Sequence, residues 1–480
     1  MLMLPEIIVV LTAGVVLCLD LFLTERSRVI LAPVTLLGLA LGFAALLVTP
    51  QTGDLLGGRF GMDPIAWWFK VIFLIAGFVT VILSMDLLDG RAAHRMRGIG
   101  FRGEYYTILL STIVGMMFLI SARETITLYV SLETATIPLF VLTAWRRDHV
   151  QSGEAGLKYV IIGALASAFI LYGLSILYGL TGQTSIVGMS AKLADVPRPA
   201  FWLAAAMLMT GVGFKLTIVP FHMWAADVYE GAPAPVTAYL SVASKAAGLA
   251  FMFQVFYRIF GSELAGWTPL IAAFAAVTMS LGNLVAIVQD NIKRFMAFSA
   301  ISQAGYLILG FLGPADNGVP AMLFYMLVYI LSNLAVFACI VWYSNETGRE
   351  RIEEYRGLSL TNPIMALGMM IALFSLAGIP PLSGFVGKFF LFSIAAKAGY
   401  NWLVAVAAVN STISLFYYLR IVRQMYIEPI YEGAGTLPVR YTVAATVGLL
   451  SLAVALMGVI PYFYETIHAQ TITWLASLIG

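Results

Sequence analysis

The sequence predicts an all-α protein that crosses a membrane about fourteen times. Of its 480 residues, 61% are hydrophobic and only 11% are charged, whereas roughly a quarter of an ordinary soluble domain is charged. Apolar runs of about 20 residues, the length of a membrane helix, recur along the whole chain. The alternating pattern of membrane strands is absent. We therefore expect a polytopic helical membrane protein, with no linker long enough to separate independent domains.

Fourteen apolar segments follow one another and account for most of the chain. We place them at residues 4–24, 28–48, 62–85, 104–121, 124–145, 155–181, 200–225, 235–259, 264–288, 294–313, 319–344, 362–396, 401–427 and 439–460. The first lacks a basic start and a small-residue cleavage site, so we interpret it as a span and not as a signal peptide. The tail after Pro461 is expected to lie at the interface or to trail off.

Basic residues divide unevenly between the two sides of the membrane. Loops that follow odd-numbered spans hold sixteen lysines and arginines, whereas loops that follow even-numbered spans hold six. Cytoplasmic loops carry an excess of positive charge. The odd loops are therefore expected to face the cytoplasm, with both termini on the opposite side.

Every arginine lies in a loop or near the end of a predicted span, and the five basic residues left are all lysines: Lys70, Lys158, Lys215, Lys245 and Lys388. A charge at mid-depth costs at least about 2.5 kcal/mol by insertion scales, so it normally faces a cavity or a partner. Arginine cannot release its proton in a protein, whereas a desolvated lysine can. An interior that uses only lysine therefore indicates groups that change protonation state.

Two of the five lysines have a simpler interpretation. Lys70 lies near the start of the third span, beside Trp67 and Trp68, and snorkelling of its ammonium group to the interface accounts for it. Lys158 lies one turn into the sixth span, where an anchor at the cytoplasmic side is the alternative to a role in transport.

Glu133 is the acidic residue that lies deep inside a predicted span. It is nine positions from Glu124 and thirteen from Arg146, which puts it near mid-depth at 1.5 Å per residue. Close to a buried lysine, the carboxylate would stay charged and hold the lysine's proton, and moving away would release that proton. A static ion pair is the alternative.

Spans seven and twelve each place prolines beside a mid-span lysine. Pro220 follows Lys215, and Pro380 and Pro381 precede Lys388. Proline frees backbone groups that must find protein or water, and breaks at paired positions are the best sequence pointer to a transport path. The two spans are five apart. Because five is odd, a copied unit enters the bilayer from the other side, which predicts inverted repeats at spans 4–8 and 9–13.

The second repeat offers uncharged polar residues where the first carries charge. Span ten offers Ser299, Ser302 and Gln303, and span thirteen offers Asn410, Ser411 and Thr412. These residues suit a hydrated proton relay, although hydrogen bonds that only pack helices are the alternative. His222, in the break of span seven, titrates near physiological pH and is a further relay candidate. A satisfied buried histidine is equally consistent with it.

No motif for nucleotide, metal or hydrolytic chemistry accompanies these residues. The sequence has no Walker loop, dinucleotide fingerprint, haem pair or hydrolase triad, and its two cysteines, Cys18 and Cys339, lie alone in separate spans. Neither a disulfide nor a metal site is indicated. A pump without an energy source of its own needs partner subunits.

Six segments together resemble the subunit N family of bacterial respiratory complex I, the proton-pumping NADH:quinone oxidoreductase, whose counterpart is the second mitochondrially encoded subunit. They are LPEIIVVL with the following LDLF, GEYYTILLSTIVGMMFLIS, TLYVSLE, GVGFKLTIVPFHMWAADVYEGAPAPVTAYLSVASKAAG, DNIKRFMAFSAISQAGY and GIPPLSGFVGKFFLF. The resemblance covers essentially the whole chain. It implies an antiporter-like fold of fourteen helices, with two inverted five-helix repeats and broken seventh and twelfth helices. We divide this single transmembrane domain at residues 1–103, 104–260, 261–428 and 429–480.

The resemblance also implies a proton route. By motif position, the route includes Glu133, Lys158, Lys215, His222, Lys245 and Lys388. Many relatives carry histidine where this chain has Gln303, which puts a titrating role for that residue in doubt. The implied protein is a translocase subunit of the bacterial inner membrane, with periplasmic termini and no redox site of its own. Flavin, iron–sulfur clusters, NADH and quinone are expected in partner subunits, and sister antiporter-like subunits are expected as neighbours.

Two other functions share part of this pattern. A subunit of a multi-component sodium/proton antiporter would carry the same lysines and the same GIPP break, but the LPEI start and the GEYY segment argue against it. A subunit that only scaffolds the membrane arm would not need an interior in which every cation is lysine.

Overall fold

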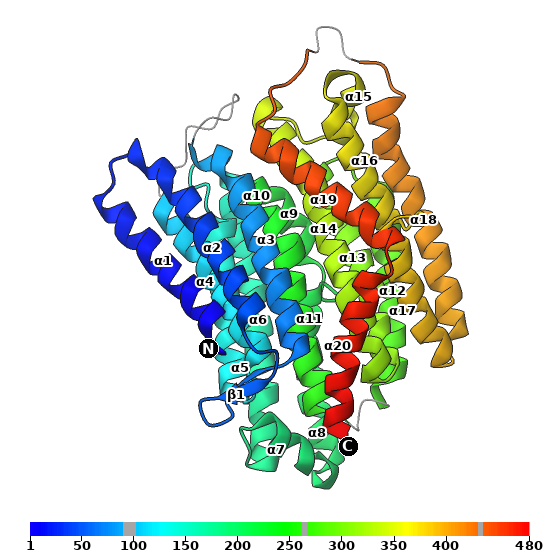
Figure 1. The fold of residues 1–480 in the computed structure, drawn as a ribbon. Helices are drawn as coiled ribbons and strands as arrows, with labels where there is room; N and C mark the ends of the chain where they lie inside the picture. The colour runs from blue at the N-terminus through cyan, green and yellow to red at the C-terminus, as the bar shows by residue number, and fades with distance from the viewer. Residues whose placement is uncertain (90–101, 262–265, 431–434, 480) are drawn as a thin grey trace. The chain divides into compact units, whose positions relative to one another are not determined.

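The computed structural model describes residues 1–89, 102–261, 266–430 and 435–479, and almost all of them lie in helices (Figure 1). Within these residues, thirteen helices are long and apolar enough to cross a membrane. The twelfth predicted span is instead a pair of shorter helices, α16 (Pro363–Ala377) and α17 (Ser383–Lys397). Together they complete the fourteen predicted spans, and the all-α membrane fold is confirmed.

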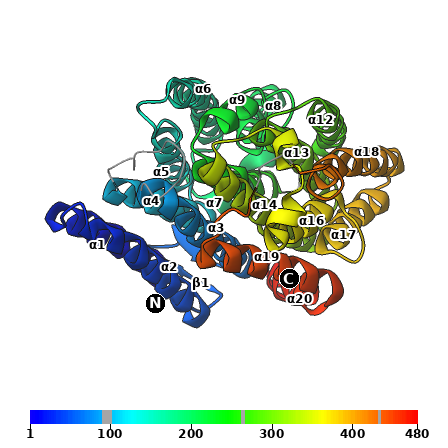
Figure 2. The same cartoon turned by 90° about the horizontal axis from the view of Figure 1, so that it is seen from above.

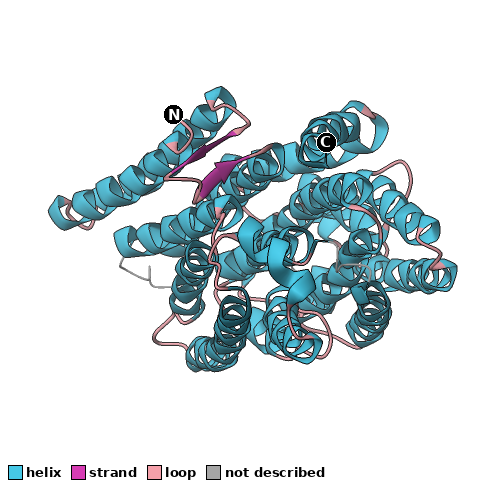
Figure 3. Ribbon diagram, turned by 90° about the horizontal axis from the view of Figure 1, so that it is seen from below, coloured by secondary structure: helices cyan, strands magenta, loops and turns pink. Residues whose placement is uncertain are grey.

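The chain divides into two compact units: the first holds the described residues of 1–81, 102–224 and 243–269, and the second holds those of 82–89, 225–242 and 270–479. The first unit begins with three helices that precede the predicted repeats. They are α1 (Leu4–Phe22), α2 (Leu31–Val48) and α3 (Pro64–Asp89), and α3 belongs to this unit as far as Val81. Between α2 and α3 the chain forms a small antiparallel hairpin of β1 (Gly53–Leu55) and β2 (Phe60–Met62), drawn as arrows in Figure 3. Its strands are three residues each, too short for periodicity to reveal.

The rest of the first unit is a helical bundle. It contains α4 (Arg102–Ser121), α5 (Thr125–Thr143), α6 (Val150–Thr181), the short α7 (Ile186–Lys192), α8 (Arg198–Leu216) and α11 (Lys245–Phe253). Helix α5 packs against α4 and α6, α6 packs against α8, and α8 packs against α11. This arrangement places α8 and α11, which carry two of the candidate lysines, side by side.

The second unit is built around α14 (Ala315–Thr347). The most apolar stretch of this helix is completely buried, and it contacts α10, α16, α17, α19 and α20. Figure 2, the view from above, shows α14 beside α16. The remaining helices of the unit are α9 (Trp224–Gly231, from Ala225 on), α10 (Ala234–Tyr239), α12 (Thr268–Ile287, from Leu270 on), α13 (Ile292–Leu307), α15 (Leu358–Thr361), α18 (Asn401–Tyr426), α19 (Tyr441–Val459) and α20 (Tyr462–Ile479). The tail after Pro461 is therefore a helix that packs on α14.

Both predicted breaks are present. Helix α8 ends at Leu216, and α9 begins only at Trp224, with Pro220 between them. Helix α16 ends at Ala377, and α17 begins at Ser383, with Pro380 and Pro381 between them. Each break contains a cis peptide bond before a proline. Because a helix end leaves its last carbonyl groups without intrahelical donors, each break creates hydrogen-bond acceptors inside a membrane span.

The eighth span is irregular in a way that its sequence does not show. Between α10 and α11 the chain forms a π-helical stretch at Leu240–Ser244, and a second π-helical stretch at Gln254–Ile259 follows α11. Such stretches are rare and often occur at functional sites. Here they flank the nine-residue helix that begins with Lys245.

Candidate functional site

Three of the predicted lysines are buried near a helix break. Lys215 lies in the last turn of α8, Lys245 begins α11, and Lys388 lies in the second turn of α17. Each is at most 3% exposed. A lysine can be buried this deeply only if its three N–H donors find acceptors, so the partners of each ammonium group decide what it can do.

Lys215 binds a hydroxyl group on the neighbouring helix. Its Nζ donates to Oγ1 of Thr136 on α5. Glu133 lies one turn earlier on the same helix, and its charge acts on the ammonium group. Among the described residues, however, no ion pair within 4 Å joins Glu133 to Lys215. The two charges interact through space, with Thr136 as the direct acceptor.

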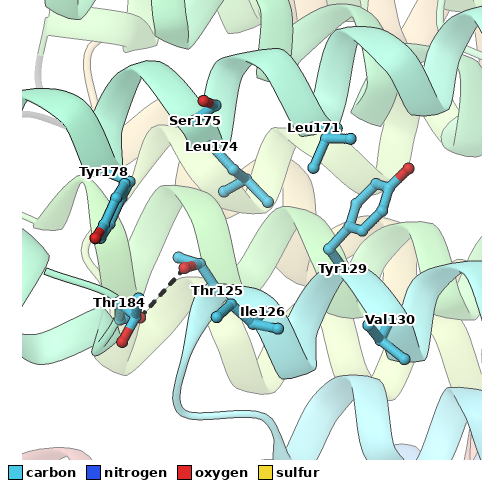
Figure 4. A pocket seen from close by; sticks show the side chains of 9 residues that line it. All are labelled: Thr125, Ile126, Tyr129, Val130, Leu171, Leu174, Ser175, Tyr178 and Thr184. Carbon is cyan, nitrogen blue, oxygen red and sulfur yellow. Dashed lines mark hydrogen bonds between the residues drawn. The ribbon is translucent and has the colours of Figure 1, made fainter.

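Glu133 on α5 is partly buried. One carboxylate oxygen, Oε1, is buried and has no hydrogen-bond partner in the described chain. Tyr129, one turn earlier, lies against the carboxylate. Figure 4 shows Tyr129 lining an open groove of about 390 Å³ between α5 and α6, whose other walls are mainly apolar. At one end of the groove, Thr125 donates to the carbonyl of Thr184 at 3.3 Å.

Lys245 takes its acceptors from the first break. Its Nζ donates to the carbonyl of Leu216 at 3.3 Å and to Oγ1 of Thr217. The Leu216 carbonyl is available because α8 ends there. Thr217 has a φ of 59°, in the left-handed region where glycine is the usual residue at a helix end. A β-branched residue held there costs about 1–3 kcal/mol and often marks a functional position.

Lys388 takes its acceptors from the second break. Its Nζ donates to the carbonyls of Leu376 and Ala377, both at 2.9 Å, and to Oγ of Ser411 on α18 at 3.2 Å. It also lies 4.6 Å from the ring centroid of Tyr306, within cation–π range. Both breaks thus supply main-chain oxygens to a buried ammonium group. The prolines indicated where the breaks lie, but not which lysine each one serves.

Gln303 shares an acceptor with Lys388. Its Nε2 donates to the Leu376 carbonyl at 3.0 Å and to the Tyr418 hydroxyl at 3.3 Å, while the Tyr325 hydroxyl donates to its Oε1. Tyr418 also lies 2.5 Å from Oγ of Ser299. Sequence reasoning missed these tyrosines, because a tyrosine in an apolar span looks like any other large side chain.

The two other predicted relay residues hydrogen-bond within a network that includes neighbouring tyrosines. Asn410 accepts from Nδ2 of Asn283 at 3.0 Å and donates to Ser280 at 3.1 Å. Ser302 donates to the carbonyl of Ser299 on its own helix at 2.9 Å. A weaker contact of 3.4 Å leads from Asn283 to the Tyr306 hydroxyl. Asn283 also accepts from the Tyr417 hydroxyl at 2.9 Å, so Asn410 is linked through Asn283 to both tyrosines.

Lys158 and His222 differ from the three buried lysines. Lys158 lies on the outer face of α6, where its side chain is 40% exposed and forms an ion pair of 2.7 Å with Glu154. His222 is partly exposed in the first break, against the backbone of Pro220, and its Nδ1 has no partner among the described residues. Their roles in proton transfer remain predictions.

Lys70 does not snorkel, so the sequence interpretation of this residue was wrong. Its side chain is completely buried, and its Nζ lies 2.6 Å from Oε1 of Glu6, which is also completely buried. Met62 and Phe60 of the hairpin cover the ammonium group, at 3.2 Å from the Met62 sulfur and 4.9 Å from the Phe60 ring centroid. The ammonium group reaches a carboxylate inside the protein instead of water, because Glu6, at the very start of α1, is packed into the core.

A second charged cluster lies beside this pair, at the start of α3. Asp63 accepts from the backbone N–H of Ala66 at 2.8 Å, from Arg123 at 2.6 Å and from Arg258. Burial disfavours the charged carboxylate, yet the guanidinium groups of Arg258 and Arg123 outweigh it and hold the pKa of Asp63 below its usual value. The cluster ties together the starts of α3 and α5 and the end of the eighth span.

These features define a class of protein. A bundle of fourteen spans, two of them broken, with buried lysines at the breaks, is the architecture of an antiporter-like membrane subunit. The profile of a family described as NADH:quinone oxidoreductase/Mrp antiporter, TM, matches residues 122–414. A relative in Moorella thermoacetica is 40% identical over 458 residues (94% of each chain), and one in Trichlorobacter lovleyi is 37% identical over 462 residues (95% of this chain, 93% of the relative). Both are named NADH-quinone oxidoreductase subunit N, and the present chain belongs to this family.

Solved structures agree with this assignment. A chain of respiratory complex I from Thermus thermophilus matches with a TM-score of 0.80 and 31% identity, covering 95% of this chain and 97% of that one. A chain of the Mrp complex from Dietzia sp. matches with a TM-score of 0.85, covering 98% and 96%, but at 23% identity it shows the fold alone.

Proposed function

We propose that the chain is a proton-translocating subunit in the membrane arm of an NADH:quinone oxidoreductase and that it moves protons along its buried lysines. The observation that carries this proposal is the environment of Lys215, Lys245 and Lys388. Each is buried at a helix break and is held by neutral oxygens. An ammonium group whose direct hydrogen-bond acceptors are neutral oxygens can give up its proton without breaking a direct ion pair.

The proposed route starts at Glu133 and Lys215 and continues through Lys245 toward Lys388. Weakening the interaction between Glu133 and Lys215 removes the charge that favours the ammonium form. Two unit charges about 4 Å apart interact by about 4 kcal/mol at an effective dielectric constant of about 20. Moving one charge across about 150–200 mV costs about 2.3 kcal/mol per 100 mV. The two energies are of similar size, so the pair can drive a step of this kind when Glu133 closes from its separation in this structure, which is beyond 4 Å, to about 4 Å from Lys215.

The remaining candidates have secondary places in the route. Lys158 and His222 lie partly exposed in the first unit and are proposed to exchange protons with its surroundings. Gln303 and Asn410 hydrogen-bond around Lys388 and Tyr306, and together with Ser302 they are proposed to orient water there, because an amide does not titrate.

The energy comes from outside the chain. We propose that quinone reduction by partner subunits, which hold the flavin, iron–sulfur clusters, NADH and quinone, changes the charge state at Glu133 and Lys215. Neither a metal nor a cofactor is expected in this chain. The neighbours would include sister antiporter-like subunits.

The chain is a multi-pass protein of the bacterial inner membrane. From the basic loops, we propose that both termini face the periplasm. We also propose that the chain consists of four parts. These are the first three helices (residues 1–103), two inverted repeats (104–260 and 261–428), and the last helix with its tail (429–480).

Substituting Lys215 with Met in the assembled complex tests the function. We expect proton pumping to be lost, because methionine keeps the apolar volume but cannot carry a proton. Proton uptake and NADH oxidation are measured together in sealed vesicles. Lys397→Met is the matched control, since Lys397 is exposed at the end of α17. Normal pumping per NADH at normal turnover in Lys215→Met would overturn the proposal.

A further inference from the structure

The three buried lysines share a hydrogen-bond arrangement that nothing in their sequence spacing indicates. Each ammonium group donates to one side-chain hydroxyl group from another part of the chain. The pairs are Lys215 with Thr136, Lys245 with Thr217, and Lys388 with Ser411. Threonine and serine are common packing residues in membrane helices, so one such contact would mean little. The same contact at all three lysines is a pattern.

Each of these hydroxyl groups also has an acceptor for its own proton. The acceptor is a backbone carbonyl in every case: Leu132 at 2.6 Å for Thr136, Leu216 at 2.5 Å for Thr217, and Ala377 at 3.1 Å for Ser411. The hydroxyl oxygen can therefore use a lone pair to accept from the ammonium group. At each of the three lysines, the ammonium group donates to the hydroxyl group, and the hydroxyl group donates to the carbonyl.

A hydroxyl group differs from the other available partners in one respect. It both donates and accepts, whereas a carbonyl or a carboxylate only accepts. When a lysine has lost its proton, the neutral amine has a lone pair that needs a donor. A hydroxyl group can rotate away from its carbonyl and donate to that lone pair, so the lysine keeps the same partner in both protonation states.

Lys70 provides the contrast within the same molecule. Its partner is the carboxylate of Glu6 at 2.6 Å, and both side chains are completely buried. If Lys70 lost its proton, Glu6 would remain as an unpaired buried charge, which is strongly unfavourable. Lys70 is therefore fixed in its charged form, although it is buried as completely as the other three.

We propose that Thr136, Thr217 and Ser411 are positioning residues for proton transfer, each holding its lysine in place in both the charged and the neutral state. The Glu6–Lys70 pair, by the same argument, is a fixed ion pair outside the route. This inference rests on the proposed function, in which the three lysines change protonation state.

The backbone at Thr217 supports a functional role for its hydroxyl group. Its φ of 59° is one that glycine adopts freely and threonine does not. At the corresponding helix end before the second break, Gly378 has a φ of 87°, and the hydroxyl group for Lys388 comes from α18 instead. The backbone conformation at the first break favours glycine over threonine, so the hydroxyl group of Thr217 is the feature that explains a threonine there.

The test removes each hydroxyl group and then restores it. Thr136→Val, Thr217→Gly and Ser411→Ala delete the hydroxyl group, while Thr136→Ser, Thr217→Ser and Ser411→Thr retain one. In the whole complex in sealed vesicles, we expect each deletion to lower protons pumped per NADH, with the proton-transfer rate falling about tenfold, the usual effect of one hydrogen bond to a charged group. The retaining variants should recover most of the loss.

Thr217→Gly separates the hydroxyl group from the fold. Glycine relieves the left-handed backbone, so the melting temperature of the complex should be unchanged or higher while pumping falls. A structural role for Thr217 would instead lower both together. This variant therefore contradicts the inference if its pumping stays normal or if its melting temperature drops in proportion to its pumping.

Lysine variants measured alongside distinguish the two proposals. If Lys215→Met, Lys245→Met and Lys388→Met all pump normally, the proposed function fails. If they lose pumping while the three hydroxyl deletions pump normally, only the present inference is overturned. The double variant Glu6→Gln/Lys70→Met should keep the wild-type ratio of protons to NADH, and a lowered ratio at normal assembly would show that this pair is not fixed.

Discussion

Lys70 and Lys215 show at the scale of single residues how the partner, and not the burial, decides what a buried lysine can do. Both side chains are almost or completely inaccessible, yet one faces a carboxylate and the other a hydroxyl group. A buried ion pair contributes little net stability compared with an apolar pair, but removing one partner leaves an uncompensated charge. The two kinds of site therefore respond differently to substitution.

The Glu6–Lys70 pair should behave as a closed structural unit. We expect Glu6→Gln to destabilise the first unit by about 3–5 kcal/mol, because the Lys70 ammonium group loses its counter-charge in the core. Adding Lys70→Met should recover most of this loss. Thermal unfolding of the purified complex, followed by release of the subunit, measures both. Equal destabilisation by the single and the double variant would contradict this account.

Asp63 should make stability depend on pH in a definite direction. Its pKa in the folded protein lies below the usual value of 3.8, so the ionised carboxylate stabilises the fold above that value. The contribution is lost as the pH falls from 3.8 through the folded-state pKa. We expect Asp63→Asn to cost about 3 kcal/mol near neutral pH.

The difference in melting temperature between the wild type and Asp63→Asn is the quantity to measure. It should be largest at neutral pH and shrink in acid as the wild-type carboxylate becomes protonated. A difference that grows in acid would show that the two arginines do not hold Asp63 in its charged form.

At the scale of elements, the helix breaks are where sequence reasoning and structure agree best. Prolines beside mid-span lysines predicted both breaks, and both are present. The partners could not be predicted, since they depend on how neighbouring helices pack. Thr136 reaches Lys215 from a helix 79 residues earlier in the chain, and nothing local marks it. Similarly, nothing in the local sequence marks Glu6 as the partner of Lys70, because the packing of α1 brings the two residues together.

Gly378 should couple the shape of the second break to Lys388. It has a φ of 87°, and a Cβ atom there would lie 3.1 Å from Cδ of Lys388. Gly378→Ala is expected to cost about 1–2 kcal/mol through its backbone and to displace the lysine, which should lower pumping per NADH.

Gly399→Ala is the matched control for that substitution. Gly399 has a φ of 86°, but a Cβ atom there would meet nothing within 4 Å. The backbone cost should therefore be similar, while the pumping ratio should stay normal. If the two variants pump equally well, the shape of the break does not set the position of Lys388.

At the scale of the whole molecule, composition and hydropathy were enough to predict the fold class and the number of spans. The antiporter-like family followed from motifs distributed along the chain. The small hairpin, the π-helical stretches around Lys245 and the last helix on α14 were not predicted. The hairpin strands are too short to show a period, the π-helical stretches have the same apolar sequence as a regular helix, and the last helix is less apolar than a span. The unequal distribution of lysine and arginine between the loops predicts which side of the membrane each terminus faces, which the fold alone does not.

Cysteine labelling tests that orientation. In a background with Cys18 and Cys339 replaced by serine, Leu56→Cys should react with an impermeant maleimide in intact cells, since Leu56 is exposed in a loop assigned to the periplasm. Glu25→Cys, exposed in a loop assigned to the cytoplasm, should react only after permeabilisation. The reverse result would place both termini in the cytoplasm.

The oxygens that seat Lys245 and Lys388 include the carbonyls of Leu216, Leu376 and Ala377, and a carbonyl belongs to every amino acid. No codon change can delete them. Saturation mutagenesis at these three positions changes only their side chains. It would therefore not detect that their carbonyl groups are direct contacts of the two lysines. A mutation can disturb these contacts only by changing the backbone of the helix break, for example at a glycine or proline in the break that does not itself bind the lysine.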